Sequence, residues 1–233
     1  MQTRRTALAT LAALPFASSA MAHGGHAPTV LRSISVGGRR IDYLVRLAGP
    51  APAPMLLCFG GGNANRGIAE YYKAVYTPEA VYRDHHMIIP IGAPDQYFHQ
   101  YDNAAVREML SALVAAEPIA GRGLISGVSN GGRAAFRFAA AVPEAFRGIL
   151  TMPGALIGDP VPAAWKDYAI LLTYGAEDPN WKAEAERAYA ALKGRAGALE
   201  RVEFAGQGHV VSPDFDADPV YARLQEMEGR LGR

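Results

Sequence analysis

The chain has 233 residues, half of them hydrophobic, which is enough to bury one sizeable core but hardly two. Its 23 basic side chains nearly balance its 22 acidic ones, and no long block of like charge interrupts the sequence. This balance excludes the strongly basic surface that phosphate backbones require. We therefore expect one domain and no nucleic acid among its partners.

The N-terminal residues have the pattern of an export signal. The pair Arg4–Arg5 precedes an apolar run over residues 7–17, and Ala20 and Ala22 match the small residues of a cleavage site. The apolar run is shorter than the roughly 20 residues that span a bilayer. We therefore expect residues 1–22 to be a cleaved signal peptide, and the protein to be periplasmic or secreted, with no stable membrane anchor after cleavage.

The export route and the segment behind the signal are less defined. The arginine pair also resembles a twin-arginine signal, although Ala7 stands where that pattern has an aromatic residue. We expect a flexible tail over residues 23–29 and a single domain over 30–233. His23 and His26 would lie at the new terminus after cleavage, where they offer a possible copper or nickel ligand set as well as a plain tail.

Two β-branched runs, Val30–Val36 and Ile41–Leu47, flank Gly37–Gly38 and predict a hairpin. Short apolar runs then alternate with longer helix-like segments, a pattern typical of a mostly parallel sheet covered on both faces. The expected strands of this part are Met55–Phe59, Met87–Ile91, Gly123–Ser126, Gly148–Met152, Ile170–Tyr174 and Arg201–Phe204. The sequence predicts an α/β fold with a central sheet of about eight strands.

The intervening segments carry the spacing of helices. Apolar residues recur at helical intervals over residues 106–113, after the glycines near position 131, and over Pro219–Leu231. Asp102 and Asn103 are expected to cap the helix that follows them rather than to bind substrate.

Cys58 is the only cysteine and lies within the first of the parallel runs. It can form no internal disulfide, and we interpret it as a buried strand residue. A catalytic thiol would need a neighbouring base and an electropositive setting, which this apolar segment does not offer.

Ser129 lies in the segment Gly127–Gly131, which fits the G-x-S-x-G nucleophile elbow. Glycines are expected there because a side chain would collide with the neighbouring strand or helix while the serine holds a strained backbone. The motif alone is weak. Its context supports it, because an apolar run over Gly123–Ser126 precedes it and a helix-like segment follows, although a plain glycine-serine turn would give the same pattern.

A serine hydroxyl needs a base to accept its proton, and a histidine is the expected one. His209 follows the last expected strand and precedes the last expected helix. His85 and His86 precede a strand and so lie at its wrong end. His99 lies behind a strand and stays a minor alternative.

The histidine in turn needs a carboxylate that fixes its tautomer and stabilises the imidazolium. Asp178 follows the penultimate expected strand, with Glu177 as the alternative. Asp178 also suits the role of a helix cap for Trp181–Leu192. The order Ser129, Asp178, His209 favours a catalytic role, since it is the order of α/β-hydrolases.

The glycine-rich loop behind the Met55–Phe59 run is expected to supply hydrogen-bond donors for an oxyanion. We predict the backbone N–H groups of Gly61 and Gly62, together with that of Asn130, for this role. A phosphate-binding loop is the competing interpretation. It is disfavoured because the lysine and the Ser/Thr of a P-loop are missing.

The elbow with its flanks, Leu124–Gly132, and the loop Gly60–Ala64 resemble the exported polyhydroxybutyrate depolymerase and feruloyl esterase family. That family's elbow commonly reads Gly-Leu-Ser-Asn-Gly-Gly, and its loop begins with a histidine where this chain has Phe59 or Gly60. The resemblance implies an α/β-hydrolase domain that cleaves esters through an acyl-enzyme, without metal or cofactor. The cysteine pairs of many secreted members are missing. We therefore expect a soluble ester or an oligomer as the substrate, rather than an insoluble polymer.

Tyr97, Phe98 and Trp181 are expected near the mouth of this site, where they could bind substrate or simply pack under loops. Two other functions stay open. An acyltransferase would use the same three residues with an alcohol in place of water. A non-catalytic exported binding protein would use none of them.

Overall fold

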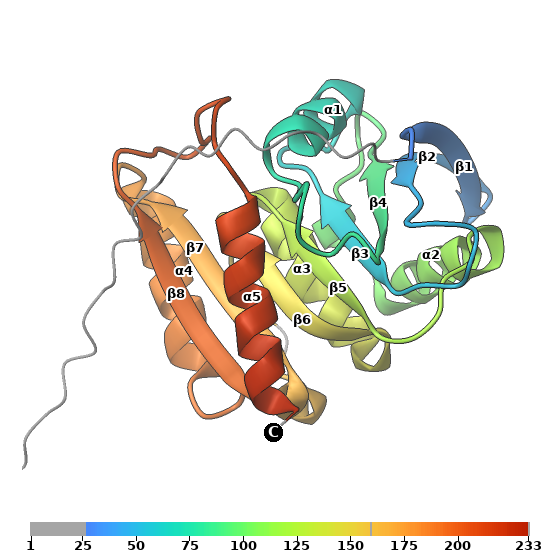
Figure 1. Ribbon diagram of the computed structural model, residues 1–233. Coiled ribbons are helices and arrows are strands. Elements are labelled where there is room, and N and C mark those ends of the chain that lie inside the picture. Colours follow the sequence, from blue (N-terminus) through green and yellow to red (C-terminus); the bar gives the residue numbers. More distant parts are fainter. Residues whose placement is uncertain (1–26, 159, 233) are drawn as a thin grey trace, which may run out of the picture.

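A computed structural model describes residues 27–158 and 160–232 (Figure 1). The predicted signal peptide and the histidines at positions 23 and 26 lie outside the described residues. Eight strands form one sheet in the order β1-β2-β4-β3-β5-β6-β7-β8. The strands are β1 (Val30–Val36), β2 (Arg39–Arg46), β3 (Met55–Phe59), β4 (His86–Ile91), β5 (Gly123–Gly127), β6 (Phe146–Thr151), β7 (Ala169–Gly175) and β8 (Ala198–Phe204).

The strands from β4 to β8 along this order are parallel, whereas β2 pairs antiparallel with both β1 and β4. The predicted hairpin and the predicted parallel strands are therefore confirmed, with shifts of up to three residues at their ends. Unbroken apolar runs form the central strands because both faces of the sheet are buried.

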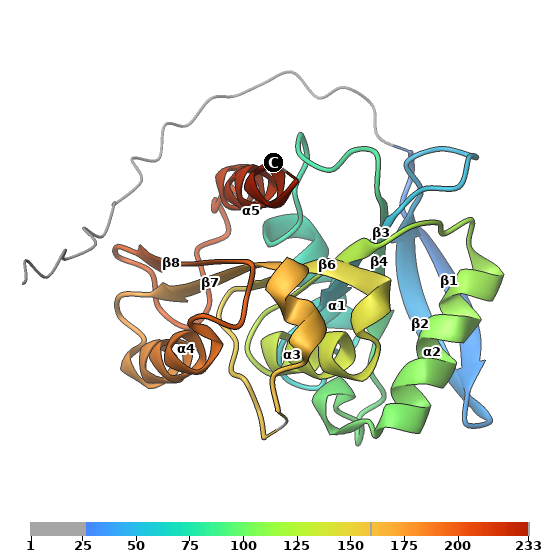
Figure 2. The same ribbon diagram turned by 90° about the horizontal axis from the view of Figure 1, so that it is seen from below.

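Five α-helices accompany the sheet in the described part of the chain. They are α1 (Arg66–Val75), α2 (Asn103–Ala116), α3 (Asn130–Ala141), α4 (Pro179–Leu192) and α5 (Asp218–Leu231). Figure 2 shows α2, α3 and α4 on one side of the sheet and α1 and α5 on the other. None of the helices in this part of the chain is long and apolar enough to cross a membrane.

The core consists of two apolar layers, one on each face of the sheet. Alternate residues of β3 separate into them, since Leu57 and Phe59 join the layer under α2, α3 and α4, whereas Leu56 and Cys58 join the layer under α1 and α5. This alternation is the period-2 geometry of a strand. Cys58 is completely buried, as expected, and burial raises the pKa of its thiol to about 12.

The helix α1 has no predicted counterpart. Its buried residues are Ala69, Tyr72 and Val75, a sparse pattern that a search for apolar residues overlooks. Asn65 caps the helix by accepting a hydrogen bond from the N–H of Ile68. Asp102 caps α2 in the same way, as predicted, by accepting from the N–H of Ala105 at 2.8 Å.

Candidate active site

Ser129 lies in the sharp turn between the end of β5 and the start of α3. Its φ of +59° belongs to the left-handed region that few residues other than glycine adopt. A Cβ at Gly127 would lie 2.2 Å from the carbonyl oxygen of Gly131, and a Cβ at Gly131 would lie 2.1 Å from that of Phe59. Both positions therefore require glycine, for the steric reason that the sequence predicts.

Hydrogen bonds from the neighbouring strand ends hold this turn in place. The N–H of Ser129 donates to the carbonyl of Pro153 behind β6 at 2.7 Å, and the N–H of Val128 donates to that of Phe59 at 3.1 Å. The serine is thus fixed at the carboxyl edge of the sheet by segments on both sides of it. Such fixed bonds are how a protein maintains a strained backbone at one residue.

His209 joins Ser129 to Asp178. Its Nε2 lies 3.1 Å from Ser129 Oγ, and its Nδ1 lies 2.7 Å from Asp178 Oδ2. The carboxylate of Asp178 is buried, whereas 41% of the His209 side chain is exposed. A hydroxyl, an imidazole and a carboxylate in this series can carry out nucleophilic catalysis with a general base.

Asp178 also caps α4, because its Oδ1 accepts from the N–H of Trp181 at 3.4 Å. The two interpretations of this residue therefore occur together, one on each carboxylate oxygen. The alternative acid, Glu177, is exposed, and its backbone N–H donates to Gln207. Of the two candidates, Asp178 is the one that contacts His209.

The loop that carries His209 is positioned by residues that the sequence analysis does not identify. The hydroxyl of Tyr76 accepts a hydrogen bond from the N–H of Val211 at 3.1 Å, and the hydroxyl of Tyr71 donates one to the carbonyl of Val211 at 3.0 Å. Gly175 lies on the other side of the loop, where only a glycine fits, because a Cβ there would lie 2.2 Å from the carbonyl oxygen of Gln207. Two tyrosines at the end of an unpredicted helix carry no local signal of this role.

The glycine-rich loop lies against the nucleophile. A Cβ at Gly61 would lie 3.4 Å from the Cβ of Ser129, so this glycine is beside the serine. Gly62 faces Ile68 instead, and its carbonyl accepts from the side chain of Asn130 at 3.3 Å. As the first residue of α3, Asn130 has no intrahelical acceptor for its backbone N–H. The placement favours Gly61 and Asn130 over Gly62 as oxyanion donors.

His85 and His86 contact groups other than the members of this triad of side chains. His86 is buried, and its ring contacts the N–H of Ala48 and the carbonyl of Pro118. His85 contacts Asp84 and Arg147. In the described part of the chain, no group of three or more His, Cys, Asp or Glu side chains could hold a metal ion.

The three aromatic residues predicted near the mouth differ in their surroundings. Phe98 is buried in the core against Phe59, with 5.2 Å between the ring centroids, which agrees with packing, the second of its two alternatives. Trp181 is half-buried and stacks on His209, with the ring centroids 5.4 Å apart. Tyr97 is also half-buried, and its ring lies 5.5 Å from that of His99.

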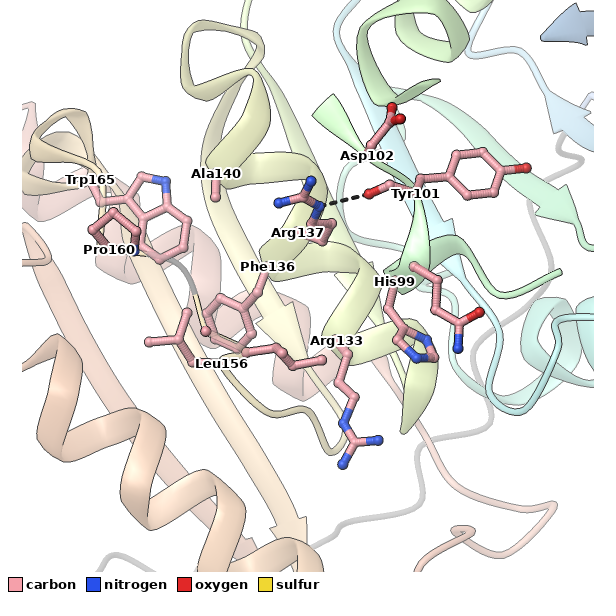
Figure 3. A pocket seen from close by; sticks show the side chains of 13 residues that line it. His99, Tyr101, Asp102, Arg133, Phe136, Arg137, Ala140, Leu156, Pro160 and Trp165 are labelled. Carbon is pink, nitrogen blue, oxygen red and sulfur yellow. Dashed lines mark hydrogen bonds between the residues drawn. The ribbon is translucent and has the colours of Figure 1, made fainter. Parts of the chain in front are cut away.

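A cavity of about 420 Å³ runs along α3 on the side of His99 (Figure 3). Arg133 and Arg137 project from the helix into this region, and Arg137 donates to the carbonyl of Tyr101 at 2.8 Å. Phe136 and Leu156 form part of its apolar side. No sequence motif indicates this cavity, because its lining comes from a helix and two separate loops.

Known structures share this arrangement of strands and helices. A ferulic acid esterase is 16% identical with a TM-score of 0.64, covering 89% of this chain and 100% of its own. The S-formylglutathione hydrolase of Agrobacterium tumefaciens is 17% identical with a TM-score of 0.64, covering 92% of this chain and 99% of its own. A thermostable esterase is 18% identical with a TM-score of 0.63, covering 88% of this chain.

The chain spans 62% of the length of that thermostable esterase. No protein-family model and no curated protein sequence matches the chain. At these identities the likeness to the solved structures shows a common fold.

Proposed function

We propose that this chain, which has the α/β-hydrolase fold, is a serine hydrolase that cleaves carboxylic esters through an acyl-enzyme. The observation that carries the proposal is the contact of His209 with both Ser129 Oγ, at 3.1 Å, and Asp178 Oδ2, at 2.7 Å. This series of side chains at the carboxyl edge of the sheet is the arrangement that nucleophilic acyl transfer requires.

The reaction proceeds in two halves. Ser129 Oγ attacks the ester carbonyl carbon while His209 Nε2 accepts the hydroxyl proton, and the carbonyl oxygen becomes an oxyanion near the N–H groups of Gly61 and Asn130. The intermediate collapses as the alcohol leaves with the proton from His209. Water then attacks the acyl-serine with His209 again as the base, which releases the acid and restores the hydroxyl. Asp178 stabilises the imidazolium in both halves.

Hydrolysis is favoured over transfer to another alcohol by the exposure of the base. With 41% of its side chain exposed, His209 can reach solvent water. An acyltransferase would need to exclude that water. Product analysis with an added alcohol acceptor distinguishes the two, because a hydrolase releases the free acid in preference to a new ester.

The proposed substrate is a soluble ester or a short oligomer, and the proposed location is outside the cytoplasm. The substrate class is based on the resemblance of Gly127–Gly132 to exported depolymerases and feruloyl esterases. The location is based on the signal-like pattern of residues 1–22. Mass spectrometry of the protein from its own cells tests the location, since export predicts a new N-terminus at His23.

Replacement of the nucleophile tests the activity. Ser129→Ala should lower kcat/KM for para-nitrophenyl butyrate by at least about a thousandfold, because the reaction loses its nucleophile and keeps only binding. Ser33→Ala, on the exposed strand β1, serves as the control and should retain full activity. Undiminished turnover by a folded Ser129→Ala protein would exclude the proposed mechanism.

A further inference from the structure

Two nitrogen atoms of the cavity beside α3 lack a hydrogen-bond partner. Arg133 Nε and His99 Nδ1 are both buried, and neither has an acceptor or donor among residues 27–158 and 160–232. Both side chains line the cavity. Buried polar groups are nearly always satisfied in native proteins, so this end of the cavity carries polar groups that a water molecule or a polar ligand would satisfy.

The charge of Arg133 is also uncompensated by a carboxylate within the described residues. One end of its guanidinium donates to the amide oxygen of Asn130 at 3.1 Å, and the group lies 4.7 Å from the centre of the Trp181 ring. Burial and the nearby charge of Arg133 lower the pKa of His99. The two cavity residues therefore share one electropositive environment, and a bound anion would neutralise its charge.

The cavity has an apolar part opposite this pair. Phe136, Leu156 and Trp165 lie on one side of it, and His99 lies on the other (Figure 3). Its volume of about 420 Å³ is in the range of sites for small organic molecules. A fitting ligand would have an apolar body and one anionic group.

The electropositive end of the cavity is close to the proposed nucleophile. Arg133 follows Ser129 by one helical turn, and its backbone N–H donates to the carbonyl of Ser129 at 3.1 Å. Trp181 contacts Arg133 through its ring and stacks on His209. An ester bound at Ser129 could therefore extend a second group toward Arg133.

We propose that this cavity selects esters that carry a carboxylate on their acyl or alcohol part, and that Arg133 and His99 bind the carboxylate oxygens. The inference rests on the proposed ester hydrolysis at Ser129 and adds the substrate class. A planar guanidinium matches the geometry of a carboxylate and forms strong charge-assisted hydrogen bonds with it. Arg133 and His99 are therefore specificity residues, not members of the reacting group.

Two matched pairs of esters test this, one for each part of the substrate. Para-nitrophenyl hemiglutarate and para-nitrophenyl glutaramate differ only in whether the far end of the acyl part is a carboxylate or an amide. The butyryl esters of lactate and of lactamide differ in the same way in the alcohol part. The measured quantity is the ratio of kcat/KM for the charged ester to that for the neutral ester.

The wild type should prefer the carboxylate in at least one pair by about tenfold or more, and Arg133→Gln and His99→Gln should each reduce that ratio severalfold. Arg107→Gln removes an exposed charge from α2 and should leave the ratio unchanged. Because the ratio compares two esters on the same variant, a general loss of activity does not affect it.

A wild type without preference in either pair would overturn the inference while the proposed function stands. Retention of the full preference by Arg133→Gln would also overturn it. A folded wild type that hydrolyses none of the four esters would count against the proposed function itself, and the inference would fall with it.

Discussion

Asp178 contacts two parts of the molecule with its two carboxylate oxygens. Oδ2 contacts His209 and Oδ1 caps α4. The sequence alone offers a helix cap and a partner of the catalytic histidine as two roles for this aspartate. The two roles can be separated experimentally, because an amide can replace the carboxylate in the cap but not beside the imidazole.

Asp178→Asn should lower kcat roughly a thousandfold or more, since the amide removes the charge that stabilises the imidazolium and can favour the wrong tautomer of His209. The free energy of unfolding should change by less than about 1 kcal/mol, because asparagine is also a good cap. Ester kinetics and urea unfolding of the same preparation measure both quantities. Glu177→Gln, at the exposed neighbour, is the control. Equal activity of the two variants would contradict the role of Asp178.

The positions of Ser129, Asp178 and His209 could be predicted because each follows a strand of the parallel sheet, and the ends of such strands meet at one edge. Phe98 shows the limit of this reasoning. Its place behind β4 suggested a site at the mouth, yet the chain turns inward there and buries the ring against Phe59. The direction in which a loop side chain points is set by tertiary packing, which a single sequence does not reveal.

At the scale of elements, close approach of backbones decides which glycines are essential. The first turn of α3 contacts the end of β3 so closely that Gly131 has no room for a Cβ. Gly229 on α5 is different, because it is exposed and nothing lies within 4 Å of its Cβ position. Both glycines are helical, so their different surroundings predict opposite effects of the same substitution.

Gly131→Ala should destabilise the protein by more than about 4 kcal/mol or prevent folding, because the methyl group would collide with backbone that cannot move independently. Gly229→Ala should stabilise it by about 0.5–1 kcal/mol, because alanine loses less entropy in a helix. Chemical unfolding of both variants measures the difference. A Gly131→Ala protein as stable as the wild type would show that α3 does not approach β3 this closely.

The strands were predicted well because apolar runs bounded by polar segments are local signals. Helix α1 was not predicted, because only three of its residues are buried, namely Ala69, Tyr72 and Val75. Because this helix was not predicted, Tyr76, which follows its last residue and holds the His209 loop, was not identified either. Tyr76 and Val211 are far apart in the sequence, so the hydrogen bond between them forms only in the folded protein.

At the scale of the whole molecule, the fold buries a few titratable side chains. His85 is one of them, with Nδ1 against Asp84 at 2.7 Å and Nε2 against Arg147 at 2.8 Å. Burial lowers the pKa of His85, although Asp84 acts in the opposite direction. The arginine contact favours the neutral ring, because a protonated Nε2 could not accept a hydrogen bond.

Stability should therefore decrease as the pH falls below about 6.5, the ordinary pKa of histidine. In this range the unfolded chain binds a proton at His85 that the folded chain does not, so acid favours unfolding. His85→Gln should show a smaller decrease in the free energy of unfolding between about pH 7.5 and about pH 5.5. Urea titrations at the two pH values measure it. An equal decrease in the variant would show that His85 is not the group responsible.

The central claim is that Ser129 is an activated nucleophile, and covalent labelling tests it most directly. A fluorophosphonate should react with the wild-type protein, and mass spectrometry of its peptides should place the single adduct on Ser129. Ser129→Ala should remain unlabelled. A folded wild-type protein that does not react, or that carries the adduct on another residue, would contradict the account.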